Sequence, residues 1–380
     1  MSTRLRVALL AGGRSSEHDI SLASARSVLE ALDSGDNDVV TVSIGRDGTW
    51  ELGGPAGHAL VPGAQPRPLE AETVAEQGKV AAATTGESAS SGHVAGPGPG
   101  AGPAETLPVP ATSSSVTQTL AEVDVVFPIL HGPFGEDGAV QGLLELANVP
   151  YVGAGVAASA LCMDKDLFKS VMRDQGIPVT RNVTLRHGAT LDESPYGYPV
   201  FVKPARLGSS VGITKAHDAN ELRAAIELGY RHDEKLLVEE FVDGVEVECS
   251  VLGNQTPIAS IPGEIRTLDH EWYDFASKYD EDGMELVIPP ELPEETIARV
   301  QQLAVEAFVA SECESMARVD FFVRPGGEVV VNELNTIPGF TATSVYAKLF
   351  EASGIPYAEL LDRLIDLALE RHDRRARLQY

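Results

Sequence analysis

The sequence is poor in cysteine and has no long apolar run. Among its 380 residues only Cys162, Cys249 and Cys313 are cysteines, and no two of them form a CxxC pair. A disulfide framework or a thiolate metal site is therefore not expected, and the chain fits a reducing compartment. No stretch approaches the roughly 20 apolar residues of a membrane-spanning helix, and the start MSTRLRVALLAGG is not typical of a signal peptide. We expect a cytoplasmic protein without membrane insertion.

Positive charge is also scarce. The chain has 29 lysines and arginines against 56 aspartates and glutamates, which gives a net charge of −27. A protein this acidic repels phosphodiester backbones, so we expect no nucleic-acid partner. Most of the carboxylates are expected to belong to a solvated surface. An anionic substrate would therefore need a local cluster of lysines and arginines.

The N-terminal part has the pattern of a doubly wound α/β sheet. Residues 5–11 and 38–44 read as strands on either side of a helix that ends near Ala31, and residues 124–130 read as another buried strand. Ligands of such sheets gather at the carboxyl ends of the strands. Residues 53–118 interrupt the pattern with a segment rich in Gly, Pro, Ala, Ser and Thr, which we expect to be a mobile surface insertion.

The remaining chain predicts two antiparallel α+β layers. Asp218 and Glu221 have the spacing of a capping box at the start of a helix. Asp243-Gly244 separates two predicted strands and is a hairpin signal. Strands are expected at residues 198–204, 212–215, 236–242, 245–252, 317–323 and 328–334, and helices at 138–148, 164–176, 294–311, 344–352 and 357–371.

The first candidate site combines charged residues from two strands near the C-terminus. Arg318 and Asp320 are two residues apart in one strand, and Glu333 and Asn335 are two apart at the end of the next. Residues two apart in a strand face the same side, so pairing of the strands would gather two carboxylates, an amide oxygen and one arginine. Mg²⁺ binds such oxygen ligands and often bridges carboxylates to substrate phosphates. The alternative is an exposed salt-bridge face, although unpaired carboxylates are costly on strands this apolar.

Two further patterns fit nucleotide binding, and each also has a plain structural interpretation. Lys203 ends a predicted strand and leads into a Gly/Ser loop that reaches Gly212. Glycines let backbone amides approach phosphates and lysine supplies charge, yet an ordinary hairpin fits equally well. In the next strand, Glu239 and Glu240 would hydrogen-bond an adenine and its ribose, or they would simply follow the alternation of the strand.

Three loops complete the candidates. His131 opens HGPFGEDG directly after a buried strand, and GGRSSE at residues 12–17 occupies a similar strand end. A lone histidine is more often structural than functional, however. Lys278 and Tyr279 lie in a polar stretch, residues 264–285, which suits either an active-site lid or a plain surface loop.

Together and in this order, the motifs resemble the D-alanine–D-alanine ligases of the ATP-grasp superfamily. The matching stretches are GGRSSEHDISL, FPILHGPFGEDGAVQGLLE, ALCMDK, VKPARLGSSVGI, KYD, ARVDFF and NELNTIPGFTATS, which cover nearly the whole chain apart from residues 53–118. The resemblance implies an N-terminal α/β domain at residues 1–163 and two ATP-grasp α+β domains at 164–246 and 247–380. The last domain would carry the active-site lid at about 264–285.

The resemblance also implies roles around the substrates. Glu17 would hold the ammonium group of the first D-alanine near His131, and Ser209 and Tyr279 would join Glu17 in a network that keeps the lid shut. Lys278 and Arg318 would stabilise charge on the transferring phosphoryl group and on the tetrahedral intermediate. An oxyanion amide and a carboxylate site for the second substrate are implied at Gly339, Ser344 and Val345.

The cofactors implied are ATP and Mg²⁺, with Mn²⁺ as a substitute. Asp320, Glu333 and Asn335 would bind the metal. Residues that would contact the nucleotide are Lys165, Lys203, Ser210, Glu239, Glu240, Val242 and Glu246. The resemblance further implies a homodimer formed through the N-terminal domain.

The implied reaction joins two D-alanines through a D-alanyl phosphate and supplies D-Ala-D-Ala for peptidoglycan precursors. The nearest alternative is a D-alanine–D-lactate ligase, but such enzymes usually lack the Lys-Tyr pair of the lid, so Lys278 and Tyr279 favour the dipeptide product. A nucleotide-binding regulatory protein without catalysis is an alternative from another class. It would lack the charge-stabilising residues, yet Lys278, Arg318 and the predicted metal ligands are all present.

Overall fold

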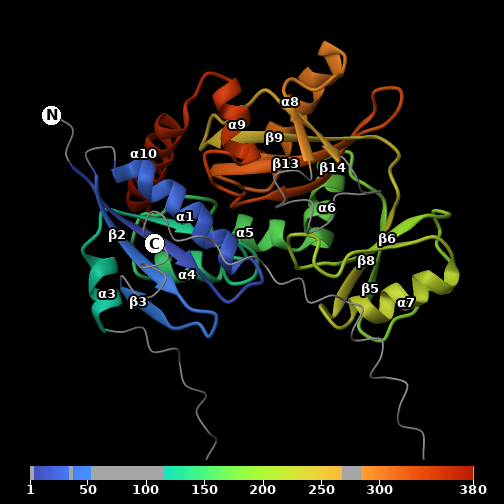
Figure 1. Cartoon of the computed structure of the whole chain (residues 1–380), viewed down its shortest axis with the longest axis horizontal. Coiled ribbons are helices and arrows are strands. Elements are labelled where there is room, and N and C mark those ends of the chain that lie inside the picture. Colours follow the sequence, from blue (N-terminus) through green and yellow to red (C-terminus); the bar gives the residue numbers. More distant parts are fainter. Residues whose placement is uncertain (1–3, 34–36, 53–113, 268–283, 380) are drawn as a thin grey trace, which may run out of the picture.

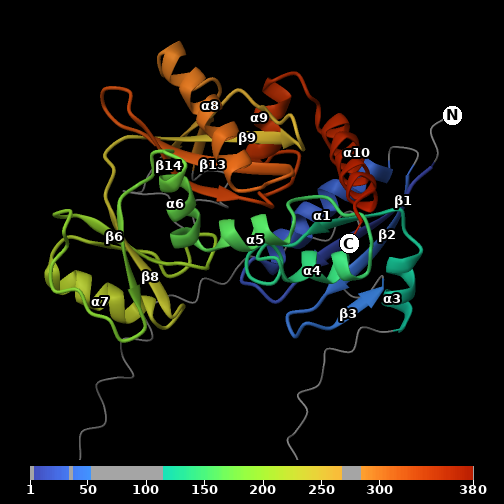
Figure 2. The same cartoon turned by 180° about the vertical axis from the view of Figure 1, so that it is seen from behind.

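The computed structural model describes residues 4–33, 37–52, 114–267 and 284–379. These residues form three sheets, which occupy three separate parts of the molecule in Figures 1 and 2. Most of the predicted insertion, and the lid residues Lys278 and Tyr279, lie outside the described residues. None of the helices within the described ranges is both long and apolar enough to cross a membrane.

The N-terminal sheet has the parallel core that its sequence predicts. Strand β1 (Arg6–Gly12) lies between β2 (Asp38–Ile44) and β4 (Val125–Ile129) and is parallel to both, and β3 (Trp50–Leu52) adds an antiparallel edge. Alternate residues of β1 pack into different cores on the two faces of the sheet. Because both faces are covered, the strand is apolar along its length rather than alternating.

Helices from both ends of the chain cover this sheet. Helix α1 (His18–Asp33) and the C-terminal helix α10 (Tyr357–Ala376) share the core on one face, and Figure 1 shows the two side by side. Residues of α3 (Ser114–Ala121) and α4 (Ala139–Leu146) belong to the core on the other face. Helix α10 is therefore part of the N-terminal core, although it lies near the C-terminal end of the sequence.

The second sheet is a small antiparallel layer with the order β5-β8-β6-β7. Its strands are β5 (Asn182–Arg186), β6 (Val200–Pro204), β7 (Thr214–Ala216) and β8 (Lys235–Glu240). Helix α7 (Ala219–Gly229) packs on it, and the carboxylate of Asp218 caps this helix by accepting hydrogen bonds from the amides of Asn220 and Glu221. The predicted cap is therefore confirmed, although the Glu221 carboxylate accepts from the amide of His217.

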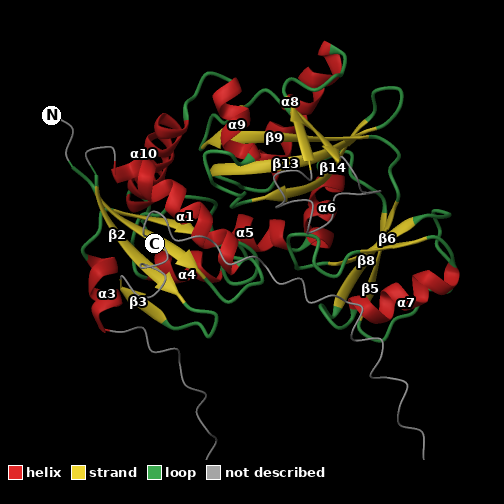
Figure 3. Ribbon diagram, in the orientation of Figure 1, coloured by secondary structure: helices red, strands yellow, loops and turns green. Residues whose placement is uncertain are grey.

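The third sheet is antiparallel and has the order β12-β11-β9-β13-β14, with β10 (Ile258–Ala259) paired to β9. Its other strands are β9 (Val245–Gly253), β11 (Gly263–Thr267), β12 (Met284–Val287), β13 (Ser315–Val323) and β14 (Val329–Asn335). Helices α6 (Lys165–Asp174) and α8 (Glu294–Ala310) share a core with its apolar face. Figure 3 shows this sheet above the other two, next to α9 (Val345–Ala352).

The structure differs from the sequence-based expectations at several elements. Asp243-Gly244 does not close a hairpin, because β8 and β9 belong to different sheets. A Cβ at Gly244 would lie 2.5 Å from the carbonyl oxygen of Val323, so the glycine allows close backbone packing here. Helix α5 (Val156–Met163) was not predicted. Helix α3 begins at Ser114, before the expected end of the insertion.

Candidate active site

Strands β13 and β14 bring the predicted metal ligands together. Arg318 lies opposite Asn335 and Asp320 lies opposite Glu333, as the expected pairing requires. The Arg318 guanidinium contacts both carboxylate oxygens of Asp320, with Nε 2.7 Å from Oδ1 and Nη2 2.8 Å from Oδ2. Asn335 Nδ2 donates to Asp320 Oδ2 at 3.0 Å. Side chains from the two strands therefore form one polar group around the buried carboxylate of Asp320.

Two more ion pairs extend this group, which we call the acidic cluster: Glu248, Arg318, Asp320, Glu333 and Lys165. Glu248 Oε2 lies 2.9 Å from Arg318 Nε, and Lys165 Nζ lies 3.1 Å from Glu333 Oε2. Burial disfavours the charged form of Lys165, but the nearby carboxylates, above all Glu333, outweigh it and raise the pKa of this lysine. Among the described residues of this cluster, three carboxylates thus share two cations, and the formal sum is one negative charge.

A second buried group, the lysine cluster, consists of Lys169, Lys203 and Glu239. Lys203 Nζ lies 2.6 Å from Glu239 Oε2, and Lys169 Nζ contacts the other carboxylate oxygen, Oε1. Burial alone would raise the pKa of Glu239, but the two lysines outweigh it and lower that pKa. Two lysines share one carboxylate, so the formal sum is one positive charge.

The two clusters meet along β14. Lys203 Nζ lies 3.4 Å from Asn332 Oδ1, and the next residue, Glu333, pairs with Lys165 of the acidic cluster. Lys165 Nζ also donates to the carbonyl oxygen of Leu207 at 2.8 Å, at the start of the Gly/Ser loop. The site therefore places an anionic and a cationic group side by side, next to a glycine-rich loop.

Glu240 faces away from the lysine cluster, because successive strand residues point to opposite sides. Its carboxylate accepts from Arg181 at 2.6 and 2.8 Å and from Arg324 at 2.9 Å. Burial would raise the pKa of Glu240, and the arginines, Arg181 first, lower it. The expected nucleotide contacts of Val242, which is buried, and of Glu246, which is half-buried in β9, stay predictions.

Glu17 connects the N-terminal sheet to the Gly/Ser loop. Its carboxylate is buried and accepts a hydrogen bond from the hydroxyl of Ser209. Ser209 and Ser210 have φ angles of 48° and 58°, in the left-handed region that non-glycine residues seldom adopt. A Cβ at Gly132 would lie 2.4 Å from Glu17 Oε2, so this glycine makes room for the carboxylate. The structure thus brings Glu17 and Ser209 together, whereas Tyr279 lies outside the described residues, and the network that would keep the lid shut stays a prediction.

His131 joins the N-terminal sheet to the loop after β14. Its Nδ1 lies 3.0 Å from the carbonyl oxygen of Ile337, and its Nε2 lies 3.5 Å from Ser24 Oγ. The same hydroxyl accepts from the amide of Phe340 at 3.3 Å, next to Gly339. Burial lowers the pKa of His131, which favours a neutral imidazole.

The residues expected to hold the second substrate lie in that same loop. Ser344 is the N-cap residue of α9, and Val345 is the first residue of the helix. Ser344 Oγ accepts from the amide of Thr341 at 2.9 Å. A Cβ built on Gly339 would lie 3.5 Å from Ser344 Oγ, so the two predicted residues are neighbours. An amide and a helix N-terminus near each other suit a carboxylate or an oxyanion.

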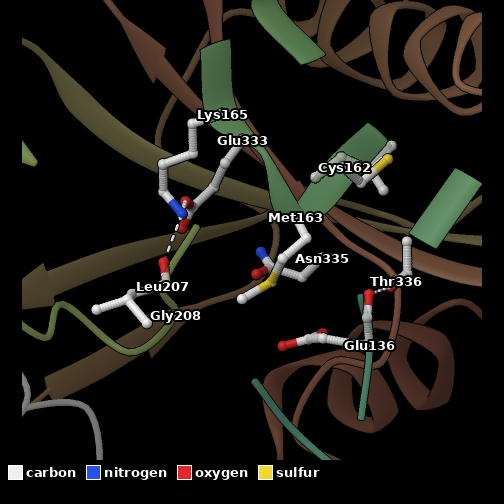
Figure 4. A pocket seen from close by; sticks show the side chains of 10 residues that line it. Glu136, Cys162, Met163, Lys165, Leu207, Gly208, Glu333, Asn335 and Thr336 are labelled. Carbon is white, nitrogen blue, oxygen red and sulfur yellow. Dashed lines mark hydrogen bonds and ion pairs between the residues drawn. The ribbon is translucent and has the colours of Figure 1, made fainter. Parts of the chain in front are cut away.

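A pocket opens between these elements, with Lys165 and Glu333 on one side and Glu136 and Thr336 on the other (Figure 4). Glu136 was not predicted. Its carboxylate accepts from the amide of Gly132 at 2.8 Å, and burial, helped by the charge of Glu17, raises its pKa to about 8. Glu248 and Lys169 were also missed. The placement of Glu248 on the face of β9 opposite its valines was the available signal for it.

Comparisons with known proteins agree with this geometry. Two family models match the chain: "D-ala D-ala ligase N-terminus" over residues 6–154 and "D-ala D-ala ligase C-terminus" over residues 171–366. The chain belongs to the D-alanine–D-alanine ligase family. This confirms the resemblance found in the motifs and the ligase class that it implies.

Individual relatives match over nearly the whole chain. D-alanine–D-alanine ligase A from Chromobacterium violaceum is 44% identical over 97% of this chain and 96% of its own length. The solved D-alanine–D-alanine ligase of Coxiella burnetii is 37% identical with a TM-score of 0.73, covering 98% of this chain and 96% of the other. The VanG D-Ala:D-Ser ligase of Enterococcus faecalis is 33% identical with a TM-score of 0.74, covering 96% and 100%. These similarities confirm the expected fold class, an α/β domain followed by ATP-grasp layers.

Proposed function

We propose that this protein is an ATP-dependent ligase that joins two D-alanines through a D-alanyl phosphate and supplies D-Ala-D-Ala for peptidoglycan precursors. The observation that carries the proposal is the meeting of the acidic cluster and the lysine cluster along β14. One cluster has the charge to hold a divalent cation and the other has the charge to hold phosphates. Their contact is the arrangement that phosphoryl transfer from ATP needs.

ATP would bind with its phosphates against Lys165 and Lys203. Lysine acts as a point charge for phosphate, and the Gly/Ser loop beside Leu207 offers backbone amides at the same place. The adenine and ribose would lie near the end of β8, around Glu239, Val242 and Glu246. The carboxylate of Glu240 is engaged by two arginines, so we assign it the task of fixing the end of β8 beside the base.

Mg²⁺, with Mn²⁺ as a substitute, fits the set Asp320, Glu333 and Asn335. Within the described ranges no three His, Cys, Asp or Glu side chains form a metal site by themselves. Two carboxylates and one amide oxygen are nevertheless typical for a magnesium ion that completes its shell with water and phosphate oxygens. When bound, the ion would neutralise charge on the transferring phosphoryl group.

The chain's own residues account for the remaining chemistry. In the first step a D-alanine carboxylate oxygen attacks the γ-phosphorus of ATP, and the bond to ADP breaks. In the second step the amine of the other D-alanine attacks the acyl carbon, and inorganic phosphate leaves with the loss of one proton. Arg318 and Lys278 would stabilise the charge that develops, and the amide of Gly339 would hold the oxyanion.

We assign the two substrates to residues of the same site. Glu17, which accepts a hydrogen bond from Ser209, would hold the ammonium group of the first D-alanine next to neutral His131. Ser344 and Val345 would hold the carboxylate of the second D-alanine at the N-terminus of α9. Lys278 and Tyr279 would close over the site, which matters because acyl phosphates are hydrolysed by water.

One assay tests the proposal. Phosphate release coupled to ATP turnover is measured with D-alanine, L-alanine, and D-alanine mixed with D-lactate or D-serine, and the products are identified by mass. We expect D-Ala-D-Ala as the main product at neutral pH and no turnover with L-alanine. A mixed product that exceeds D-Ala-D-Ala would favour a D-alanine–D-lactate or D-alanine–D-serine ligase instead.

Assembly, location and domain limits belong to the proposal as well. Helix α4 leaves Leu143 and Leu146 exposed, at 41% and 91%, and adjacent exposed leucines suit a homodimer interface on the N-terminal part. Sedimentation of the protein and of L146E would test this, with a dimer expected only for the unchanged chain. A cytoplasmic location and domains at 1–163, 164–246 and 247–380 remain predictions.

A further inference from the structure

Lys169 is a buried lysine that has no place in the roles given above. It lies in α6 four residues after Lys165, so the two side chains leave the same side of the helix. Its side chain has no exposed surface, and the adjacent residue Phe168 packs in the core of the C-terminal sheet. An ammonium group in such a place is costly unless it is fully paired, so its partners show what it does.

Among the residues that the structure describes, Lys169 has two polar partners, and one of them belongs to the nucleotide site. Its ammonium group donates to Glu239 Oε1 and to Thr180 Oγ1. The other oxygen of Glu239 lies 2.6 Å from Lys203. One carboxylate, itself 1% exposed, is therefore held between two ammonium groups.

We infer that Lys169 is a positioning residue of the nucleotide site, which neutralises Glu239 so that Lys203 keeps its positive charge for the phosphates of ATP. The inference deepens the proposed function and rests on it. With Lys169 present, two lysines and one carboxylate sum to one positive charge. Without Lys169, Glu239 and Lys203 would neutralise each other, and the lysine cluster would lose its surplus positive charge. The rest of the chain would not supply that charge to the phosphates, because the whole chain has a net charge of −27.

The electrostatic state of Lys169 agrees with this role. Burial lowers its pKa to about 8, and the like charge of Lys203 acts in the same direction, whereas Glu239 opposes both. The lysine is thus held charged mainly by the carboxylate that it neutralises. A purely structural role is the competing explanation, because Thr180 belongs to a segment that pairs with Val331 of β14.

Calorimetry on full-length K169M with ATP and with adenosine separates the two explanations. Surplus charge acts on phosphates alone, so we expect the Kd of ATP to rise at least about tenfold, the size of one lost charge-assisted contact. The Kd of adenosine should stay unchanged. Equal weakening of both ligands, or no change in either, would overturn the inference.

Removing the opposing charge supplies a rescue test. In K169M/E239Q, Lys203 has no carboxylate to pair with, so the preference for ATP over adenosine should return to that of the unchanged protein. In E239Q alone the preference for ATP over adenosine should exceed that of the unchanged protein. This single variant keeps the inference testable if K169M does not fold. Failure of E239Q to raise the preference would contradict the inference.

Lys235 offers a matched control. It is a second buried lysine, paired with Asp164 and Asp166 at 2.8 Å each, and it does not touch Glu239. K235M should cost stability but keep the preference for ATP over adenosine. If the unchanged protein neither bound ATP nor made D-Ala-D-Ala, the proposed function itself would fail; an active enzyme whose K169M variant binds ATP normally would refute the role of Lys169 alone.

Discussion

The acidic cluster and the lysine cluster have opposite formal charges, although both consist of strand carboxylates and basic side chains. Both are buried groups of strand carboxylates, and both take a lysine from α6, Lys165 in one and Lys169 in the other. Three carboxylates share two cations in the first, and two lysines share one carboxylate in the second. The formal surplus differs in sign, so one cluster suits a divalent cation and the other suits phosphates. In a protein with a net charge of −27, local pairing rather than total charge decides which ligands bind.

The largest expected effect comes from removing the arginine of the acidic cluster. In R318A the turnover number should fall by about 10³-fold, because the developing charge on the phosphoryl group and the tetrahedral intermediate loses its fixed partner. ATP should still bind, since the lysine cluster is intact. Steady-state kinetics and ATP calorimetry check both parts, with R318K as a variant that keeps a cation beside Glu248 and Asp320. Turnover that survives in R318A would favour a different role for the site.

The next effect concerns the metal. E333Q should raise the Mg²⁺ concentration needed for half-maximal turnover by about 10- to 100-fold, the usual cost of disturbing a metal site. A chelator should abolish activity in the unchanged protein, and Mg²⁺ or Mn²⁺ should restore it. E328Q provides the control, because Glu328 lies directly before β14, its side chain is 66% exposed, and it pairs with Arg324. An equal magnesium requirement in E333Q and the unchanged protein would remove Glu333 from the metal site.

A smaller effect is expected where the loop meets the N-terminal sheet. S209A removes the hydrogen bond to Glu17 and should raise the KM for D-alanine by about three- to tenfold, the value of one hydrogen bond. The KM for ATP should change less, because Ser209 is separate from both clusters. S170A is a suitable control, since the Ser170 hydroxyl is exposed and its partners, the carbonyl oxygen of Asp166 and the side chain of Arg173, both belong to α6. Equal KM values for D-alanine in S209A and S170A would argue against the contact.

The smallest effect is a pH dependence of stability. Burial lowers the pKa of His131 below its ordinary value near 6.5, so the unfolded chain takes up the proton first as the pH falls. Stability that is present above about pH 6.5 should be lost below it, by at most about 1.4 kcal/mol per pH unit for one group. Urea titrations at several pH values on the unchanged protein and H131Q check this. If H131Q does not reduce the pH dependence of the free energy of unfolding, that dependence comes from other groups.

The sequence predicted the centre of the acidic cluster, although not Glu248, because strand alternation is a local property. Arg318 with Asp320, and Glu333 with Asn335, stand two apart on apolar strands, and pairing of those strands was enough to bring them together. The parallel N-terminal strands followed from their apolar runs in the same way.

What the sequence did not predict depends on contacts between distant segments. In the sequence, nothing distinguishes Lys169 from other lysines of an amphipathic helix. Its role becomes visible only because the fold brings Glu239 into contact with it. Asp243-Gly244 is a sequence typical of a hairpin turn, but Gly244 instead allows the backbone to approach Val323 of another strand closely. Glu136 becomes notable only through burial beside Glu17. Lys278 and Tyr279 lie outside the described residues, so their roles still rest on the family resemblance.

ATP binding in the absence of divalent cations tests the contrast between the clusters most directly. Calorimetry in chelator would compare the unchanged protein with K203M and D320N. We predict that K203M weakens metal-free ATP binding by at least about tenfold, whereas D320N leaves it equal or tighter, because a carboxylate near the phosphates is removed. Added Mg²⁺ should then strengthen ATP binding in K203M but not in D320N. Equal weakening of metal-free binding in both variants would contradict the division of the site into a cation-binding and a phosphate-binding half.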